Sequence, residues 1–425
     1  AGVKNLEFAM GMVYKDSLFW GALASAWPFE TKATNERGCV ISMSIKTGKW
    51  ESYACGTRTI NGLTLGPEGE LFGTENNGNW VPASKLLHFQ KGHFYGVHKD
   101  IPGPFDNAGE TQPAVWIEHG VVGISPTQPA YLKSGIYKGQ MIAGDNNFGT
   151  LQRYFLEKVG NGYQGAVFRF SSGLDAAANR IIEGPDSALY IGGIGTDQWG
   201  GWSWNNKFYG LQRMAPNGAN RFDLLAVRSL SATTMELEFT EPVGAGAEVA
   251  ANYAVKHWGY VPVREYGVGK QPSTSLTVST AKLSADQKKV TLTLSGMKLK
   301  DVIYIKLSNV LSVTGNLAPW STEAWYTMNA FGPATPATSV SPSTALDHRP
   351  AKFNVQTLAD GKVSLQIASV GTFTLEIRDP GGRLLESRTG VGPTEMSTSV
   401  PHRAGLLLVS VKDAGGTASK VVAPR

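Results

Sequence analysis

The chain has 425 residues, a formal net charge of +5 and 17% charged residues, against roughly 25% in an average globular protein. So small a charge gives no reason to expect a nucleic-acid partner, and no apolar run approaches the roughly 18–20 residues of a membrane span. Its 50 glycines and 22 prolines exclude a coiled coil, and with abundant Thr, Ser, Val and Tyr they predict an all-β fold. The length predicts two to four domains.

Residues 1–215 carry a loose internal repeat of about 50 residues. Its copies lie at 10–19, 61–72, 139–145 and 179–190. Each copy is an apolar strand, a Pro/Gly turn and a second apolar strand, and the period is that of a four-stranded propeller blade. Because no more than four such units fit here, we expect either a small four-bladed ring or a partial propeller completed by another segment. We favour the second.

The two cysteines, Cys39 and Cys55, flank a predicted hairpin. Strands over 40–45 and 50–54 are joined by a turn at Thr47-Gly48, a pair suited to a hairpin turn. Antiparallel pairing then places the cysteines opposite each other, where their Cβ atoms are close enough to bridge. One interpretation is a disulfide, which implies an oxidising, extracytoplasmic compartment; the other is two free buried thiols.

The remainder of the chain changes character near residue 220. Alternating apolar and polar residues predict half-buried strands at 234–239, 289–294 and 302–307. Regular turns between them predict an antiparallel β-sandwich over 220–330. Residues 331–350 are rich in Pro, Ser, Thr and Ala and predict an extended linker. A second small β-sandwich is predicted over 351–425, with strands at 363–367 and 373–377 and a turn at 379–382.

Several segments of the first region resemble motifs of one family. Residues 56–63, followed by 66–72, are similar to a Gly-x-Arg-Asn-Pro-x-Gly-Leu blade motif, with further matches at 137–141, 151–153 and 180–186. These motifs resemble the glucose/sorbosone dehydrogenases, which are six-bladed propellers that hold pyrroloquinoline quinone (PQQ) and calcium. The resemblance covers about half of the chain and implies the C-terminal part of a six-bladed β-propeller.

The resemblance also implies roles for individual residues. Arg58 matches an arginine that contacts the quinone, and Arg180 lies near another that faces the central pocket. A guanidinium suits this role because it stays charged and pairs bidentately with carboxylates. Glu75 and Asn76 stand where the family has an acidic residue and a histidine, and Thr59 replaces an asparagine. The family's catalytic base is a histidine of an earlier blade, so the resemblance implies an N-terminal propeller fragment of the same precursor as partner.

The later regions carry two other resemblances. Residues 304–307 with Gly315-Asn316 are similar to the final strands of bacterial Ig-like domains. Residues 373–384, 404–409 and 420–422 resemble C-terminal sorting domains of proteins exported by type IX secretion. Together they imply a partial propeller followed by two small β-sandwich domains on a surface-directed protein.

Other residues have the chemistry of a ligand site. Asp145 and Asn146 carry the oxygen donors that calcium prefers, and Asx turns explain them equally well. Tryptophans on Gly- and amide-rich loops suit a carbohydrate platform, because ring faces stack on pyranose C–H surfaces; the alternatives are an ordinary turn and domain packing. These tryptophans are Trp80, Trp199, Trp202 and Trp204. Three histidines, His88, His93 and His98, recur every five residues. This spacing does not place side chains on one face of a helix or of a regular strand, so structural or pocket-lining roles are expected for them.

Two functions fit these observations. The first is PQQ-dependent oxidation of an aldose by a secreted or cell-surface protein, with calcium and a preceding propeller fragment. The second is a non-catalytic carbohydrate-binding or structural surface protein that uses the propeller as a binding or assembly module. The start at Ala1 has no apolar signal segment, so we expect a processed or excised chain.

Overall fold

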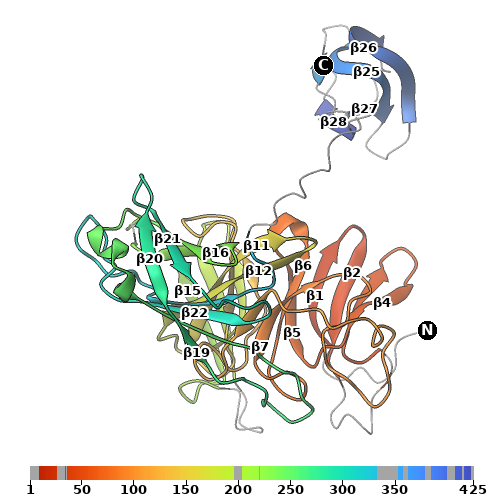
Figure 1. Cartoon of the computed structure of the whole chain (residues 1–425). Coiled ribbons are helices and arrows are strands. Elements are labelled where there is room, and N and C mark those ends of the chain that lie inside the picture. The colour runs from red at the N-terminus through yellow and green to blue at the C-terminus, as the bar shows by residue number, and fades with distance from the viewer. Residues whose placement is uncertain are drawn as a thin grey trace. The chain divides into compact units, whose positions relative to one another are not determined.

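The computed structural model describes residues 9–25, 34, 36–195, 203–219, 221–332, 353–357, 362–378, 384–399, 407–413 and 416–422. Across these residues the regular elements are β-strands and three short 3-10 segments, so the fold is all-β, as predicted. The chain divides into two compact units, Ala1–Thr335 and Pro336–Arg425 (Figure 1). Among the described residues no helix is long and apolar enough to cross a membrane. Most of the expected linker, 333–350, lies outside them.

The first unit opens with two antiparallel sheets, each built from four consecutive strands. The first sheet contains β1 (Ala9–Lys15), β2 (Leu18–Leu23), β3 (Cys39–Ser44) and β4 (Trp50–Cys55). The second contains β5 (Ile60–Leu65), β6 (Leu71–Glu75), β7 (Ser84–Phe89) and β8 (Val115–Ile117). Consecutive strands paired in chain order are the arrangement of a propeller blade. The two sheets share an apolar core that includes Ala22, Leu63 and Phe89.

Two further sheets continue the series. The third contains β9 (Ala130–Tyr131), β10 (Met141–Gly144), β11 (Thr150–Val159) and β12 (Gly162–Ser172), and the fourth contains β13 (Ala177–Glu183), β14 (Leu189–Ile194) and β15 (Tyr209–Met214). A core that includes Ile142, Leu151, Ile181 and Ile191 joins them. The first unit thus contains four successive blade-like sheets, which is a partial propeller.

The predicted hairpin and its disulfide are confirmed. Strands β3 and β4 pair antiparallel, with Cys39 opposite Cys55, and a disulfide joins the two residues. Gly48 in the turn has a φ of +66°, a conformation that glycine adopts without steric penalty. Both cysteines are fully buried, so the disulfide belongs to the core of the first blade. A structural disulfide is typical of extracytoplasmic proteins.

The first and fourth sheets each leave one apolar face exposed. Side chains alternate across a strand, and on β1 Met12 and Tyr14 are 70% and 55% exposed. On the fourth sheet Ile182, Tyr209 and Leu211 are 65%, 83% and 76% exposed. The opposite faces of both sheets pack on neighbouring blades. We refer to these two exposed surfaces as the open blade faces.

The alternating segments after residue 220 form strands where they were predicted. Strands β17 (Thr234–Phe239), β21 (Lys289–Leu294) and β22 (Val302–Leu307) bury alternate residues. One four-stranded sheet combines β16 (Leu224–Ser231) with β17, β21 and β20 (Val278–Leu283). The second group contains β18 (Tyr253–Trp258), β19 (Thr274–Leu276), β22 and β23 (Glu323–Thr327). Side chains of both groups fill one apolar core.

The second group of strands is continuous with the third blade. Strand β23 pairs antiparallel with β12, with Ala166 opposite Tyr326, so one eight-stranded sheet spans both regions. A fully buried ion pair adds to this connection, because Arg153 Nη2 of β11 lies 3.2 Å from the Asp223 carboxylate beside β16. The blades and the strands after 220 therefore share backbone pairing and buried charge.

The C-terminal unit is a five-stranded antiparallel sheet. Its strands are β24 (Phe353–Thr357), β25 (Lys362–Arg378), β26 (Leu384–Ser399), β27 (Leu407–Asp413) and β28 (Gly416–Val422). The two short strands expected at 363–367 and 373–377 are one long strand, β25, because both halves pair with β26 across an irregularity between Ile367 and Gly371. The expected turn at 379–382 lies outside the described residues.

Candidate functional site

Arg58 lies just before β5 and is held by the loop that follows β6. Its backbone N–H donates to the Glu75 carboxylate, and Nη1 donates to the Asn77 carbonyl at 3.0 Å. Its guanidinium carbon lies 5.0 Å from the ring centroid of Tyr266. A Cβ on Gly78 would lie 2.2 Å from Arg58 Nε, so a glycine at 78 leaves space for this side chain. The β6–β7 loop therefore fixes the orientation of Arg58.

Glu75 supports Arg58 from within the core. Its Oε2 lies 3.1 Å from Lys85 Nζ, and the two side chains are 0% and 1% exposed. Lys85 Nζ also donates to the Tyr95 carbonyl at 3.0 Å, so the buried cation has a second partner, as a buried pair requires. The adjacent Asn76 Oδ1 is buried with no hydrogen-bond partner. Glu75 thus positions the backbone of Arg58, and Asn76 retains a free acceptor.

Arg180 extends from β13 to the start of β5. Its Nη1 donates to Asn61 Oδ1 at 2.9 Å and to Asn179 Oδ1 at 2.8 Å, and its Nη2 donates to the Asn61 carbonyl at 3.2 Å. Burial lowers the pKa of Arg180, because desolvation disfavours its charged form. Every one of these acceptors is neutral. In the described part of the chain no carboxylate forms an ion pair with Arg180.

Arg58 precedes β5 in the chain and Arg180 contacts Asn61 of β5, and neither guanidinium has a carboxylate partner among the described residues. Arg58 approaches from the loop beside Asn77, and Arg180 approaches through Asn61. A partly buried guanidinium that is bound only to neutral acceptors favours the binding of an anion, because a carboxylate would supply the missing counter-charge. Both guanidinium groups therefore have the chemistry that binds a carboxylate.

The predicted calcium ligands do not fit a metal ion in their observed geometry. Asp145 is fully buried, and its Oδ2 accepts backbone N–H bonds from Ile124 at 2.8 Å and Ser125 at 3.0 Å. Its Oδ1 accepts the Asn147 N–H at 2.8 Å. Burial raises the pKa of Asp145 to about 6. Of the two predicted ligands, Asn146 retains a buried oxygen, Oδ1, without a hydrogen-bond partner. The described residues contain no group of three His, Cys, Asp or Glu that could hold a metal.

The predicted tryptophan platform is divided between loops. Trp80, before β7, packs edge-on against His98 with ring centroids 4.8 Å apart. Trp204, before β15, packs against Phe148 at 6.3 Å, and its buried Nε1 has no hydrogen-bond partner. No contact joins Trp80 to Trp204 in the described chain. Trp199 and Trp202 lie outside the described residues.

The three regularly spaced histidines have structural contacts. Buried His88 lies 3.6 Å from the Glu70 carboxylate, and burial lowers its pKa. His93 Nδ1 lies 3.0 Å from Thr111 Oγ1, and His98 packs between Trp80 and Phe94. Their described contacts do not include Arg58 or Arg180.

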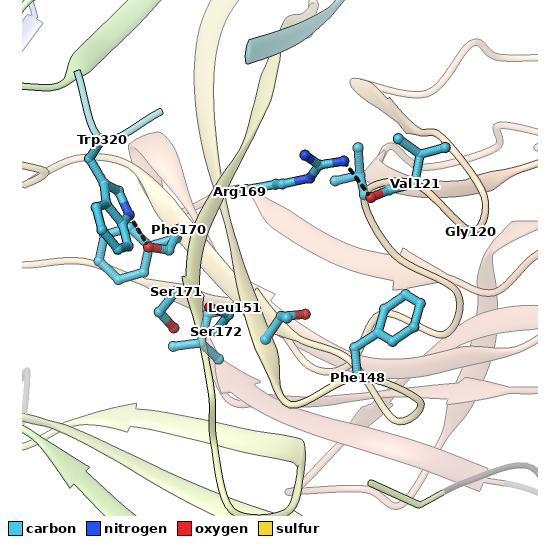
Figure 2. Close-up of a pocket in the computed structure, with 11 residues that line it drawn as sticks. Gly120, Val121, Phe148, Leu151, Arg169, Phe170, Ser171, Ser172 and Trp320 are labelled. Carbon is cyan, nitrogen blue, oxygen red and sulfur yellow. Dashed lines mark hydrogen bonds between the residues drawn. The ribbon is translucent and has the colours of Figure 1, made fainter. Parts of the chain in front are cut away.

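A further cavity, absent from the sequence analysis, lies against the third blade (Figure 2). It has a volume of about 350 Å³ and is lined by β11, β12, the loop at 120–122 and Trp320. We refer to it as the side pocket. No predicted site residue lines it. The sequence gives little indication of this pocket, because residues far apart in the chain build it. Trp320 donates a hydrogen bond to the carbonyl of Phe170, about 150 residues earlier.

Comparison with known proteins gives distant similarity only. No protein-family model and no curated protein matches the chain. Among solved structures, the chain is similar to a provisionally assigned oxidoreductase (glucose dehydrogenase) from Thermus thermophilus, with 17% identity and a TM-score of 0.37 over 48% of this chain and 65% of that chain. It is also similar to the PQQ-bound aldose sugar dehydrogenase from Streptomyces coelicolor, with 16% identity and a TM-score of 0.37 over 48% of this chain and 62% of that chain.

A third similar structure is native alpha-2-macroglobulin from Escherichia coli spanning domains MG0-NIE-MG1, with 8% identity and a TM-score of 0.15 over 67% of this chain and 95% of that chain. The match spans less than two thirds of the length of each dehydrogenase structure. Identities this low concern the fold alone.

Proposed function

We propose that the first unit is the ligand-binding part of an extracytoplasmic, surface-directed protein, and that Arg58 and Arg180 bind the carboxylates of PQQ. The observation that carries the proposal is Arg180, a partly buried guanidinium whose hydrogen-bond acceptors are all neutral. PQQ supplies three carboxylates and a two-electron acceptor when bound. Arg58, with its backbone held by Glu75, would provide the second cation.

Aldose oxidation would need a base that accepts the sugar hydroxyl proton, and no described histidine contacts either arginine. We propose that this base comes from further blades of the same precursor. The open blade faces support this proposal, because exposed apolar patches of this kind mark interaction surfaces. They offer Met12 and Tyr14 on one side and Tyr209 and Leu211 on the other. We include no calcium in the proposal, since Asp145 already accepts three backbone N–H bonds.

Localisation and the C-terminal unit complete the proposal. The buried Cys39–Cys55 disulfide supports secretion or cell-surface display, because such bonds persist in oxidising compartments. We propose that the C-terminal sheet acts as the export or anchoring module. The second candidate function is non-catalytic carbohydrate binding, which the aromatic side pocket favours.

A titration with PQQ tests the proposal. Quenching of tryptophan fluorescence reports binding, since all 11 tryptophans lie in the first unit. Arg180→Gln should weaken binding roughly tenfold or more, because a hydrogen bond to a charged group contributes about 1.5–3 kcal/mol, and Arg180→Lys should retain part of the affinity. Arg213→Gln is the matched control, because Arg213 is on the same sheet and already pairs with Asp186 at 2.7 Å.

Two results would overturn the proposal. The first is the absence of saturable PQQ binding, both to this chain and to this chain co-expressed with its upstream segment. Equal affinity of the wild type and Arg180→Gln would also remove the arginines from the site.

A further inference from the structure

We infer that the side pocket binds one neutral hexopyranose unit. None of the residues proposed to hold PQQ lines this pocket, so the inference is independent of the proposed cofactor. A volume of about 350 Å³ lies at the lower end of the roughly 300–1,000 Å³ of small-molecule sites. That size suits a single sugar ring.

A break in strand pairing builds the pocket. Leu151 of β11 pairs with Ser171 of β12, and the next residue, Gln152, pairs with Arg169, so Phe170 is skipped. In a regular strand neighbouring side chains point to opposite faces, whereas a bulge re-aims them. As a result, four successive residues, 169–172, border one pocket. Figure 2 shows Arg169, Phe170, Ser171 and Ser172 along this strand.

Two hydroxyl groups at the pocket wall have no partner. Thr150 Oγ1 and Ser171 Oγ are buried, and no hydrogen bond satisfies either atom. A buried hydroxyl without a partner is unfavourable, and a hydroxyl can both donate and accept. A ligand rich in hydroxyl groups would satisfy both atoms.

Aromatic rings supply the complementary apolar surface. Trp320 is 49% exposed. The orientation of its indole is fixed, because Nε1 donates to the Phe170 carbonyl and the Arg221 guanidinium lies 4.6 Å from its ring centroid. Phe148 lies on another wall of the pocket (Figure 2). Ring faces stack against the C–H face of a pyranose. The pocket therefore combines stacking surfaces with unpaired hydroxyls.

The charge of the pocket favours a neutral ligand. Arg169 is the cation at its wall, and its Nη1 lies 2.7 Å from Glu323 while its Nη2 donates to the Val121 carbonyl at 3.0 Å. A guanidinium with a carboxylate partner has little need of an anionic ligand. This distinguishes the side pocket from Arg180, whose acceptors are neutral.

The experiment uses the full chain and presents the hexopyranose in two forms, as a free glycoside and as the terminal residue of a glycan. Methyl glycosides of glucose, galactose and mannose are titrated by calorimetry, and terminal hexopyranoses are presented on a glycan array. The variants are Trp320→Ala, which removes the stacking ring, and Thr150→Val, which exchanges the unpaired hydroxyl for a methyl group. Phe208→Ala is the matched control, because Phe208 is an aromatic residue 46% exposed that does not line the side pocket.

The expected result is saturable binding of at least one hexopyranose. Trp320→Ala should weaken that binding tenfold or more, and Phe208→Ala should not change it. Thr150→Val should weaken binding while leaving the urea midpoint unchanged or higher, because the wild-type hydroxyl has no partner to lose; a merely structural role would lower both. If the protein binds glycans on the array and no free glycoside, the pocket recognises the terminal hexopyranose of a longer glycan. No binding of either form, or wild-type affinity in both pocket variants, overturns the inference.

Discussion

Replacing Lys85 with methionine tests whether the buried pair beneath Arg58 holds this part of the second blade. Glu75 and Lys85 are 0% and 1% exposed, and their charged atoms lie 3.1 Å apart. Lys85→Met leaves the Glu75 carboxylate buried without a cation, and breaking a buried pair in this way costs about 3–5 kcal/mol. Glu75→Gln removes the other charge and should have a comparable effect. The double variant leaves no unpaired charge, so it should be less destabilised than the sum of the single variants.

The assay is urea unfolding followed by tryptophan emission, which reports only the first unit because all 11 tryptophans precede Pro336. Glu51→Gln is the control, since Glu51 and Lys91 form an ion pair at 2.8 Å with exposures of 58% and 64%. Exposed pairs of this kind contribute little to stability, so its midpoint should not move. An equal shift for Lys85→Met and Glu51→Gln would refute the reasoning, as would a fully additive double variant.

Three other changes have defined outcomes. Replacing both Cys39 and Cys55 with serine should lower the free energy of unfolding by about 3 kcal/mol for a sequence separation of 16, and unreduced protein with the fully reduced mass would contradict the disulfide. Burial raises the pKa of Asp145 from 3.8 to about 6, so the folded state binds this proton more tightly than the unfolded state. The contribution of Asp145 to stability is then largest below about pH 4 and falls by about 3 kcal/mol as the pH rises to 6. Urea unfolding from pH 4 to 7 should show this slope in the wild type and not in Asp145→Asn; identical slopes would contradict it. Arg153→Met leaves Asp223 buried without its cation, so urea unfolding should show a loss of about 3–5 kcal/mol, and a wild-type midpoint would be the contrary result.

Local periodicity accounts for the parts of the fold that could be predicted from the sequence. Strands β17, β21 and β22 begin and end at the predicted residues because each buries alternate side chains, and the period of two is visible in the sequence. The register of Cys39 and Cys55 followed from one turn. The single long strand β25 was not predicted, because its continuity depends on pairing with β26, which is a non-local interaction.

The candidate site was less predictable, because its geometry depends on contacts between distant segments. Asp145 lies among residues of calcium-site chemistry, but the backbone of Ile124 and Ser125 occupies its carboxylate. No local pattern indicates that Arg180 reaches Asn61, which is 119 residues away. The side pocket needed both a strand bulge and a tryptophan from a later region. In each case the residue type was visible in the sequence and its partner was not.

A crystal structure of the full chain with PQQ, combined with the Arg180→Gln variant, tests the central claim most directly. We predict that a carboxylate of the quinone lies within hydrogen-bonding distance of the Arg180 guanidinium, that a second anionic group lies near Arg58, and that the variant lacks the ligand under the same conditions. A saturated crystal in which Arg180 contacts only Asn61 and Asn179, or in which PQQ lies elsewhere on the chain, would contradict the account.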